Sequence, residues 1–66
     1  MIMVPVASSA IAAIGYDPST QRMTILFTSG RSYTFCRVPS SVHARMMSAP
    51  SKGRFYDDHI KNRYHC

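Results

Sequence analysis

Short runs of hydrophobic residues bounded by turn residues make up much of the first half of the chain, and one of these runs alternates with polar residues at the period of two that is typical of β-strands. Residues 10–16 are almost entirely apolar. Residues 17–20 are Asp, Pro, Ser and Thr, which form a turn signal because proline fixes φ. Over residues 21–28 the apolar side chains of one face are Met23, Ile25 and Phe27. Residues 31–36 are again rich in strand formers. We therefore predict three strands in an antiparallel meander.

The turn between the second and third predicted strands sets which face of the sheet carries the aromatic residues. Gly30 offers the positive φ that a tight hairpin requires. A two-residue loop would place Tyr33 opposite Leu26, whereas a three-residue loop with a bulge at Gly30 would place it beside Ile25. Phe35 shares the face of Tyr33, because the two residues are two positions apart. A slip of one residue reverses that face, and the sequence leaves both registers open.

The second half of the chain contains two segments with helical spacing. The first covers residues 39–48 and is ended by Pro50, and the second covers residues 54–62. Their apolar positions are Val42, Met46 and Ala49 in the first segment, and Tyr56, Ile60 and Tyr64 in the second. Asp57 and Lys61 are four residues apart and would form a favourable acid–base pair on the second helix.

These elements fill the chain of 66 residues, so we predict one domain over residues 1–66. Its fold class is α+β: a small three-stranded antiparallel β-meander packed with one or two short C-terminal helices. A domain of this size buries only about 60% of the surface of its unfolded chain. A deep substrate cavity would remove core that the domain needs, so we expect a non-enzymatic protein without a cofactor.

The two cysteines and the N-terminal segment bear on the cellular location. Cys66 is the last residue, where a disulfide to Cys36 would have to tie down a fraying end, so we expect two free thiols. Residues 1–6 are apolar but few, include Pro5 and lack a positive flank, so they are neither a signal peptide nor a membrane span. We expect a cytoplasmic protein with no membrane partner.

No residue pattern predicts a metal site or a catalytic group. The three histidines and two cysteines lack the closely spaced ligand pairs of a structural zinc site. Residues 51–54, Ser-Lys-Gly-Arg, lack the preceding glycine of a phosphate-binding loop, and a turn that presents two cations explains them better. Asp57 and Asp58 are adjacent and point apart on a helix, so they do not form a carboxylate pair.

The distribution of charge is the feature that most strongly indicates a function. The net charge is +5, from eight Lys and Arg against three acidic residues. In residues 1–30 the only charged side chains are Asp17 and Arg22, which cancel. Residues 31–66 hold seven basic and two acidic side chains and so carry the whole net charge. This segregation exceeds what solubility requires and favours an acidic partner.

Basic and aromatic residues together are the composition that binds single-stranded nucleic acid, because cations contact phosphates and rings stack on bases. The predicted phosphate contacts are Arg31, Lys52, Arg54, Lys61 and Arg63. Tyr33 and Phe35 would stack on bases if the hairpin register leaves them exposed. The alternative is a protein-interaction or self-associating adaptor domain that uses an exposed sheet face or edge strand. In that case the aromatic residues belong to the core and the cations only solvate the surface.

The order and spacing of several short motifs resemble the KTSC domain, a small bacterial module named from its occurrence at the C-terminus of some lysyl-tRNA synthetases. The resemblance covers about residues 8–64. The residues that carry it are Ser8-Ser9-x-Ile11-x-x-Ile14-Gly15-Tyr16-Asp17, Thr28-Ser29-Gly30-Arg31, Tyr33-Thr34-Phe35, Val38-Pro39-x-Ser41-Val42 and Ala49-Pro50-Ser51-Lys52-Gly53-Arg54-Phe55, with Ile60 and Tyr64 near the end.

The resemblance implies a stand-alone domain for which RNA binding is suggested by the synthetase-linked members. A tRNA-like or single-stranded RNA is therefore the expected partner, ahead of DNA. The family has a Tyr-x-Tyr step where this chain has Tyr33-x-Phe35, so one hydroxyl of the family pattern is missing here. Stacking by the second ring stays chemically possible, but its hydrogen bond is lost.

Overall fold

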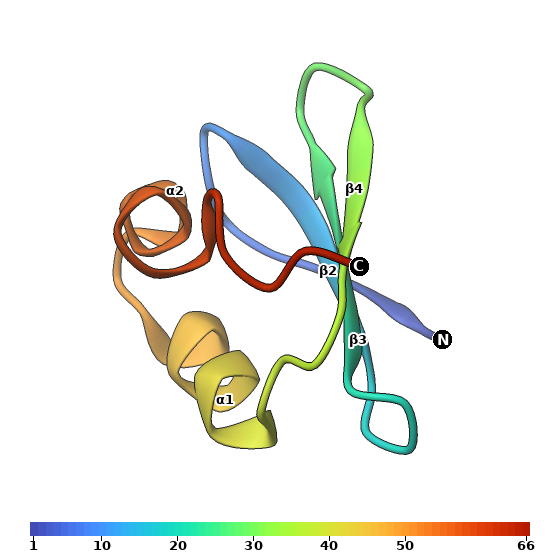
Figure 1. The fold of residues 1–66 in the computed structure, drawn as a ribbon. Coiled ribbons are helices and arrows are strands. Elements are labelled where there is room, and N and C mark those ends of the chain that lie inside the picture. Colours follow the sequence, from blue (N-terminus) through green and yellow to red (C-terminus); the bar gives the residue numbers. More distant parts are fainter.

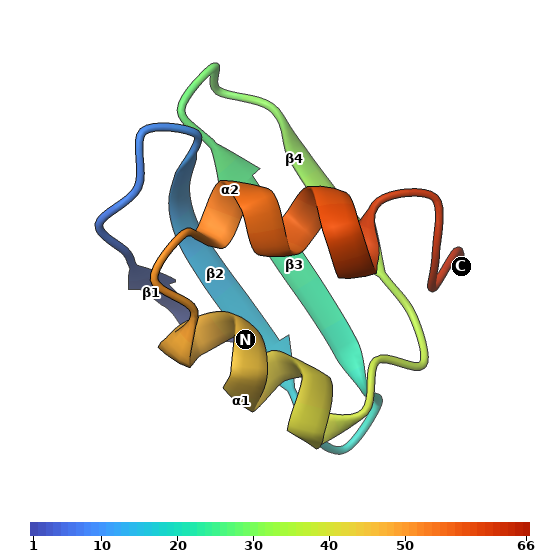
Figure 2. The same ribbon diagram turned by 90° about the vertical axis from the view of Figure 1, so that its left-hand side faces the viewer.

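Four antiparallel strands form one sheet in a computed structural model that describes all residues, 1–66 (Figure 1). The sheet order is β1-β2-β3-β4, so each strand pairs with its neighbours in sequence. The strands are β1 (Met3–Pro5), β2 (Ile11–Asp17), β3 (Arg22–Phe27) and β4 (Ser32–Phe35). Two helical segments cover one face of this sheet (Figure 2). The α+β class is confirmed. The prediction of three strands is wrong, because the N-terminal strand β1 adds a fourth strand to the sheet.

The strand that the sequence analysis missed is short and contains a proline. Met3 pairs with Gly15 and Pro5 with Ala13, and the amide of Val6 donates to the carbonyl of Ala12 at 3.1 Å. Hydrogen-bonded and non-hydrogen-bonded pairs alternate in an antiparallel ladder, so Pro5 lies at a position whose backbone faces away from β2. A proline is tolerated there because no ladder hydrogen bond is lost.

The β3–β4 hairpin has the three-residue loop that was one of the two predicted alternatives. The amide of Phe27 donates to the carbonyl of Arg31 at 2.8 Å, and the amide of Gly30 donates to the carbonyl of Phe27 at 3.0 Å. Gly30 has φ 96°, in the region that favours glycine. Tyr33 therefore lies opposite Ile25, on the face that the helices cover.

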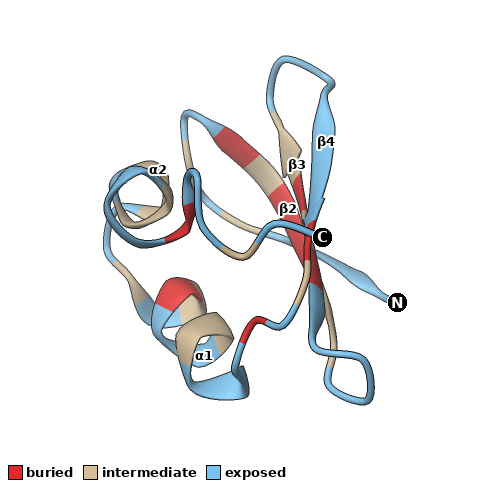
Figure 3. Ribbon diagram, in the orientation of Figure 1, coloured by how far each residue is buried: buried red, intermediate tan, exposed pale blue.

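The buried residues lie on the sheet and on the segments that face it (Figure 3), and their apolar side chains form one core between these two layers. This core consists of Ile11, Ile14, Met23, Ile25, Phe35, Val38, Met46 and Ile60. The phenol of Tyr16 donates to the carbonyl of Val38 at 2.6 Å, which fixes the segment that leads from β4 into the first helix. That helix, α1 (Ser40–Ser48), begins one residue later than predicted, with Pro39 as its N-cap, and buries Met46.

The second helical segment begins at α2 (Lys52–Phe55) and continues as a π-helix, η1 (Tyr56–Ile60). It therefore starts and ends two residues earlier than predicted. The amide of Lys61 donates to the carbonyl of Tyr56 at 2.8 Å, five residues back, and Lys61 itself has left the helix. The predicted Asp57–Lys61 pair is wrong for this reason. The acid–base pair that forms joins Arg54 Nε and Asp58 Oδ2 at 3.6 Å, on the surface.

After η1 the chain returns to the sheet and is tied to the end of β4 by a disulfide between Cys36 and Cys66. We call residues 61–66 the C-terminal tail. The amide of Cys36 donates to the carbonyl of Tyr64 at 2.8 Å, beside the disulfide. The expectation of two free thiols is therefore wrong: the terminus does not fray, because a backbone hydrogen bond already holds the tail against β4.

Candidate nucleic-acid interface

The five predicted phosphate-contacting cations lie in three separate places. Arg31 follows the tip of the β3–β4 hairpin, Lys52 and Arg54 lie on α2, and Lys61 and Arg63 lie in the C-terminal tail. Lys52 and Lys61 flank opposite ends of the same helical segment, roughly 13 Å apart at 1.5 Å per residue. The fold therefore does not gather all five cations into one patch.

The two cations of α2 are engaged within the protein. The ammonium of Lys52 donates to the carbonyl of Ala49 at 2.9 Å and is partly buried. The guanidinium of Arg54 lies 3.6 Å from the carboxylate of Asp58, which offsets its charge locally. Both side chains were predicted to contact phosphates, and each would first have to give up its partner within the protein to do so.

A cavity of about 290 Å³ lies between β4, η1 and the C-terminal tail, and we call it the β4 pocket. Its lining includes Tyr33, Phe35, Tyr56, Lys61, Asn62 and His65. Tyr33 and Phe35 are two predicted stacking residues and Lys61 is a predicted cation, so the pocket joins candidates that are almost thirty residues apart in sequence. This is the one place where the fold brings predicted aromatic and basic site residues to a common cavity.

Four aromatic rings form the apolar part of the pocket and its surroundings. The ring centroid of Tyr56 lies 5.0 Å from that of Phe27 and 6.0 Å from that of Phe35, and the centroids of Phe27 and Tyr33 are 5.8 Å apart. All three pairs pack edge to face. Phe35 is only 7% exposed and belongs to the core, so the condition for it to stack on a base is not met. Tyr33 is 47% exposed and meets that condition.

The hydroxyl of Tyr56 stays protonated across the physiological range. Burial raises the pKa of this phenol above its ordinary value of 10.0, and the neighbouring Tyr33 phenol and Asp57 carboxylate raise it further. Tyr56 therefore presents a neutral hydroxyl beside the β4 pocket, able to donate or accept a hydrogen bond.

The C-terminal tail forms one wall of the β4 pocket through Asn62, His65 and Cys66. Besides the disulfide, the guanidinium Nη2 of Arg37 donates to the carbonyl of His65 at 3.1 Å. Arg37 was counted in the charge of the second half but not proposed as a site residue. Only its position next to Cys36 could have indicated that it would lie at this wall.

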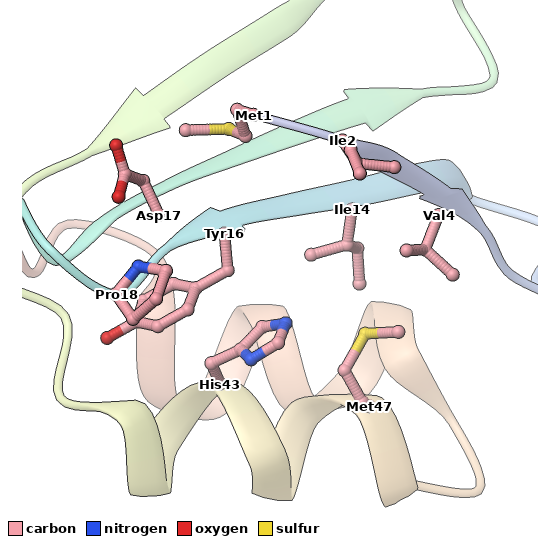
Figure 4. A pocket seen from close by; sticks show the side chains of 9 residues that line it. All are labelled: Met1, Ile2, Val4, Ile14, Tyr16, Asp17, Pro18, His43 and Met47. Carbon is pink, nitrogen blue, oxygen red and sulfur yellow. The ribbon is translucent and has the colours of Figure 1, made fainter.

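A larger, mostly apolar cavity of about 570 Å³ lies between β1, β2 and α1, and we call it the β1 groove (Figure 4). Ile2 and Val4 line it and are 82% and 44% exposed, and Met47 of α1 lies across from them. The rings of Tyr16 and His43 stack in parallel at 4.4 Å beside it. Residues 1–6 were expected to be neither a signal peptide nor a membrane span, and the apolar run at positions 1–4 is the sequence feature that could have indicated this surface.

Burial lowers the pKa of His43 from its ordinary value of 6.5, so the imidazole of the β1 groove is neutral at physiological pH. The chain has no helix with the length and apolar character that a bilayer crossing requires. No three His, Cys, Asp or Glu side chains gather into a group that could hold a metal ion.

Comparison with known proteins gives consistent matches over most of the chain. The model of the KTSC domain matches residues 7–64. A protein of Tsukamurella paurometabola is 44% identical over 62 residues, which cover 94% of this chain and 92% of that protein. The crystal structure of a KTSC domain protein from Yersinia pestis superposes with a TM-score of 0.93 at 43% identity, and covers 96% of this chain and 89% of that one.

A third similarity is to part of a much larger protein. The lysine–tRNA ligase of a Nostoc species is 39% identical over 56 residues, which are 85% of this chain but only 10% of the ligase. The ligase of Nostoc punctiforme matches to the same extent. The resemblance that the sequence motifs indicated is thereby confirmed, with nearly the same boundaries.

Proposed function

The chain belongs to the KTSC domain family, and on that premise we propose that it is a non-enzymatic RNA-binding module. The observation that supports this proposal most directly is the β4 pocket, where the exposed ring of Tyr33 and the ammonium of Lys61 line one cavity. A second support is the occurrence of a similar segment within lysine–tRNA ligases, whose names state that they act on tRNA.

In this proposal the strand of RNA runs along β4 and the C-terminal tail. Arg31, Lys61 and Arg63 are exposed and contact phosphates, while Tyr33 stacks on a base. Lys52 and Arg54 contribute less, because an internal hydrogen bond and an ion pair already engage them. Phe35 supports the pocket from below and does not touch the strand.

The proposal is tested by titrating fluorescently labelled single-stranded RNA with the purified protein at low salt. Lys61→Ala should weaken binding several-fold, because it removes a cation beside the pocket. Arg22→Ala is the matched control: it removes the same charge at the start of β3, on the sheet face opposite to buried Met23 and outside the lining of the β4 pocket, where Arg22 pairs across the ladder with Asp17. Absence of RNA binding by the folded wild type would overturn the proposal, and so would equal losses in the two variants.

An RNA partner would place the chain in the cytoplasm, where most proteins keep their cysteines reduced. The Cys36–Cys66 disulfide would then be exposed to reduction there. Rapid alkylation of freshly lysed cells, followed by mass spectrometry of the chain, measures how much of the disulfide exists in that compartment.

The β1 groove favours a second candidate function, a protein-interaction or self-associating domain. Its exposed side chains, Ile2 and Val4, are apolar and lie next to a groove rather than on a polar surface. An apolar contact at this groove would change little with salt, whereas RNA binding would weaken steeply. Sedimentation of the protein alone at low and high salt detects self-association, and Val4→Ser should reduce it.

A further inference from the structure

The β4 pocket has the size of a site for one small planar group. Its volume of about 290 Å³ is just below the range for small-molecule pockets, which begins near 300 Å³, so it suits a group smaller than a drug-sized ligand. Tyr33 and Tyr56 provide aromatic surface, and the tail opposite them provides polar side chains. A flat, polar-edged molecule fits these walls better than an aliphatic one, because only a π-face gains from stacking on tyrosine.

Two polar side chains of the tail that line the pocket, those of Lys61 and Asn62, have no partner within the protein. Neither Asn62 nor Lys61 takes part through its side chain in any hydrogen bond of the chain. The only ion pair of the chain joins Arg54 and Asp58, so Lys61 has no acidic partner either. A primary amide offers a donor and an acceptor side by side, which matches the edge of a nucleobase.

The conformation of the tail explains why the amide lies there. Asn62 has φ 60°, a left-handed conformation that asparagine tolerates better than most residues. This residue turns the chain out of η1, and the disulfide at Cys66 holds the end of the turn against β4. The amide therefore belongs to a tethered segment and not to a loose end.

We propose that the β4 pocket binds a single unpaired nucleobase of the RNA strand, with the base on the ring of Tyr33, its edge at the amide of Asn62 and its phosphate at Lys61. This inference rests on the proposed RNA-binding function and adds to it a discrete site for one nucleotide. An aromatic side chain of a protein partner would use the rings but would leave Asn62 and Lys61 without partners, so the base is the better match.

The test compares a short single-stranded RNA with the same RNA carrying one abasic position, over a series in which the abasic position moves along the strand. For the wild type, one abasic position should weaken binding roughly 5- to 150-fold, the range that alanine substitution of a stacking aromatic residue gives for one base. Tyr33→Ala should weaken binding of the intact RNA by a similar factor and be insensitive to that abasic position.

Asn62→Gly removes the amide without straining the backbone, because glycine adopts positive φ freely. Binding of the intact RNA should fall several-fold in this variant, and Gln21→Gly is the matched control, since Gln21 also has positive φ but lies in the β2–β3 turn. Circular dichroism verifies that each variant is folded. Equal affinity of Asn62→Gly and the wild type would overturn the assignment of the amide.

A measurement on the wild type alone guards against variants that fail to fold. Adenosine and uridine monophosphate at millimolar concentration should shift the side-chain amide resonances of Asn62 in ¹⁵N NMR spectra. If RNA binds with the expected salt dependence but neither nucleotide moves these resonances, the pocket inference is wrong and the proposed function stands. If an aromatic dipeptide moves them and the nucleotides do not, the pocket serves a protein partner. If no RNA binds at all, the proposed function fails first.

Discussion

Gly30 shows how one residue sets the position of a whole strand. Its φ of 96° closes the three-residue loop, and a Cβ placed there would meet no atom within 4 Å. The cost of another side chain would therefore come from the backbone conformation alone. That conformation determines the β3–β4 register and so the direction in which Tyr33 points.

Gly30→Val should lower the free energy of unfolding by about 1 kcal/mol or more, because a β-branched residue is strongly disfavoured at positive φ. Ser29→Val, one position earlier and without positive φ, should change it by less than about 0.5 kcal/mol. Urea denaturation monitored by circular dichroism measures both values. Equal stability of Gly30→Val and the wild type would mean that the loop does not have this conformation in solution.

His43 makes stability depend on pH. Its pKa in the folded protein is lowered by burial from 6.5, so the unfolded chain takes up a proton first as the pH falls. The stabilising contribution of neutral His43 is complete above pH 6.5 and is lost as the pH decreases from there toward the folded-state pKa. The two other groups with shifted pKa values are Asp17, lowered from 3.8, and Tyr56, raised from 10.0, and both titrate outside this window.

We therefore expect the midpoint of thermal unfolding to be lower at pH 5.5 than at pH 7.5. In His43→Phe, which keeps a flat ring beside Tyr16, this decrease should be largely absent. Differential scanning calorimetry at the two pH values checks the expectation. A decrease of equal size in the variant would assign the effect to another group.

Among the elements, those with a strong local pattern could be predicted and those that depend on distant contacts could not. The strand around residues 10–16 follows from an apolar run before a turn, the strand around residues 21–28 from alternation, and α1 from its apolar spacing between two prolines. Strand β1 has no such pattern, since Pro5 interrupts it and its pairing partner lies ten residues away. The π-helical turn η1 leaves no mark that distinguishes it from an α-helix in the spacing of Tyr56 and Ile60.

The candidate site could be predicted only in part for the same reason. Tyr33 and Lys61 were each identified from residue type, but their proximity depends on the path of the C-terminal tail. That path depends on the pairing of Cys36 with Cys66, which sequence separation alone does not indicate. Because free thiols were expected, the position of the C-terminal tail beside β4, where it lines the β4 pocket, could not be predicted.

The disulfide that joins the tail to Cys36 is expected to stabilise the fold strongly. A disulfide that closes a loop of 30 residues stabilises a fold by about 3–4 kcal/mol through the entropy of the unfolded chain. Dithiothreitol should thus lower the urea midpoint of the wild type markedly, while Cys36→Ser should start low and not respond to the reductant. No response in the wild type, with reduction verified by thiol titration, would contradict the stabilising role.

For the whole molecule, the charge distribution predicts the salt dependence of RNA binding. If Arg31, Lys61 and Arg63 each neutralise one phosphate of a single strand, log K should fall with log salt at a slope of about −2. Arg63→Ala should reduce that slope by about 0.7, whereas Tyr33→Ala should lower affinity and leave the slope unchanged. Titrations between low and physiological salt measure these slopes. A slope near zero would favour the apolar β1 groove as the binding surface.

The two outer strands of the sheet differ in how they would meet a second sheet. On the outer edge of β1, Pro5 has no amide hydrogen to donate to another strand. At the outer edge of the sheet just after β4, the amide of Cys36 already donates to the carbonyl of Tyr64. The molecule therefore offers no complete template from which strands of other copies could be added into a growing fibril. Opening the disulfide would loosen the cover on β4 alone, since the proline on β1 is permanent. Any polymer that formed under reducing stress would thus begin at β4, and growth past β1 would stay blocked.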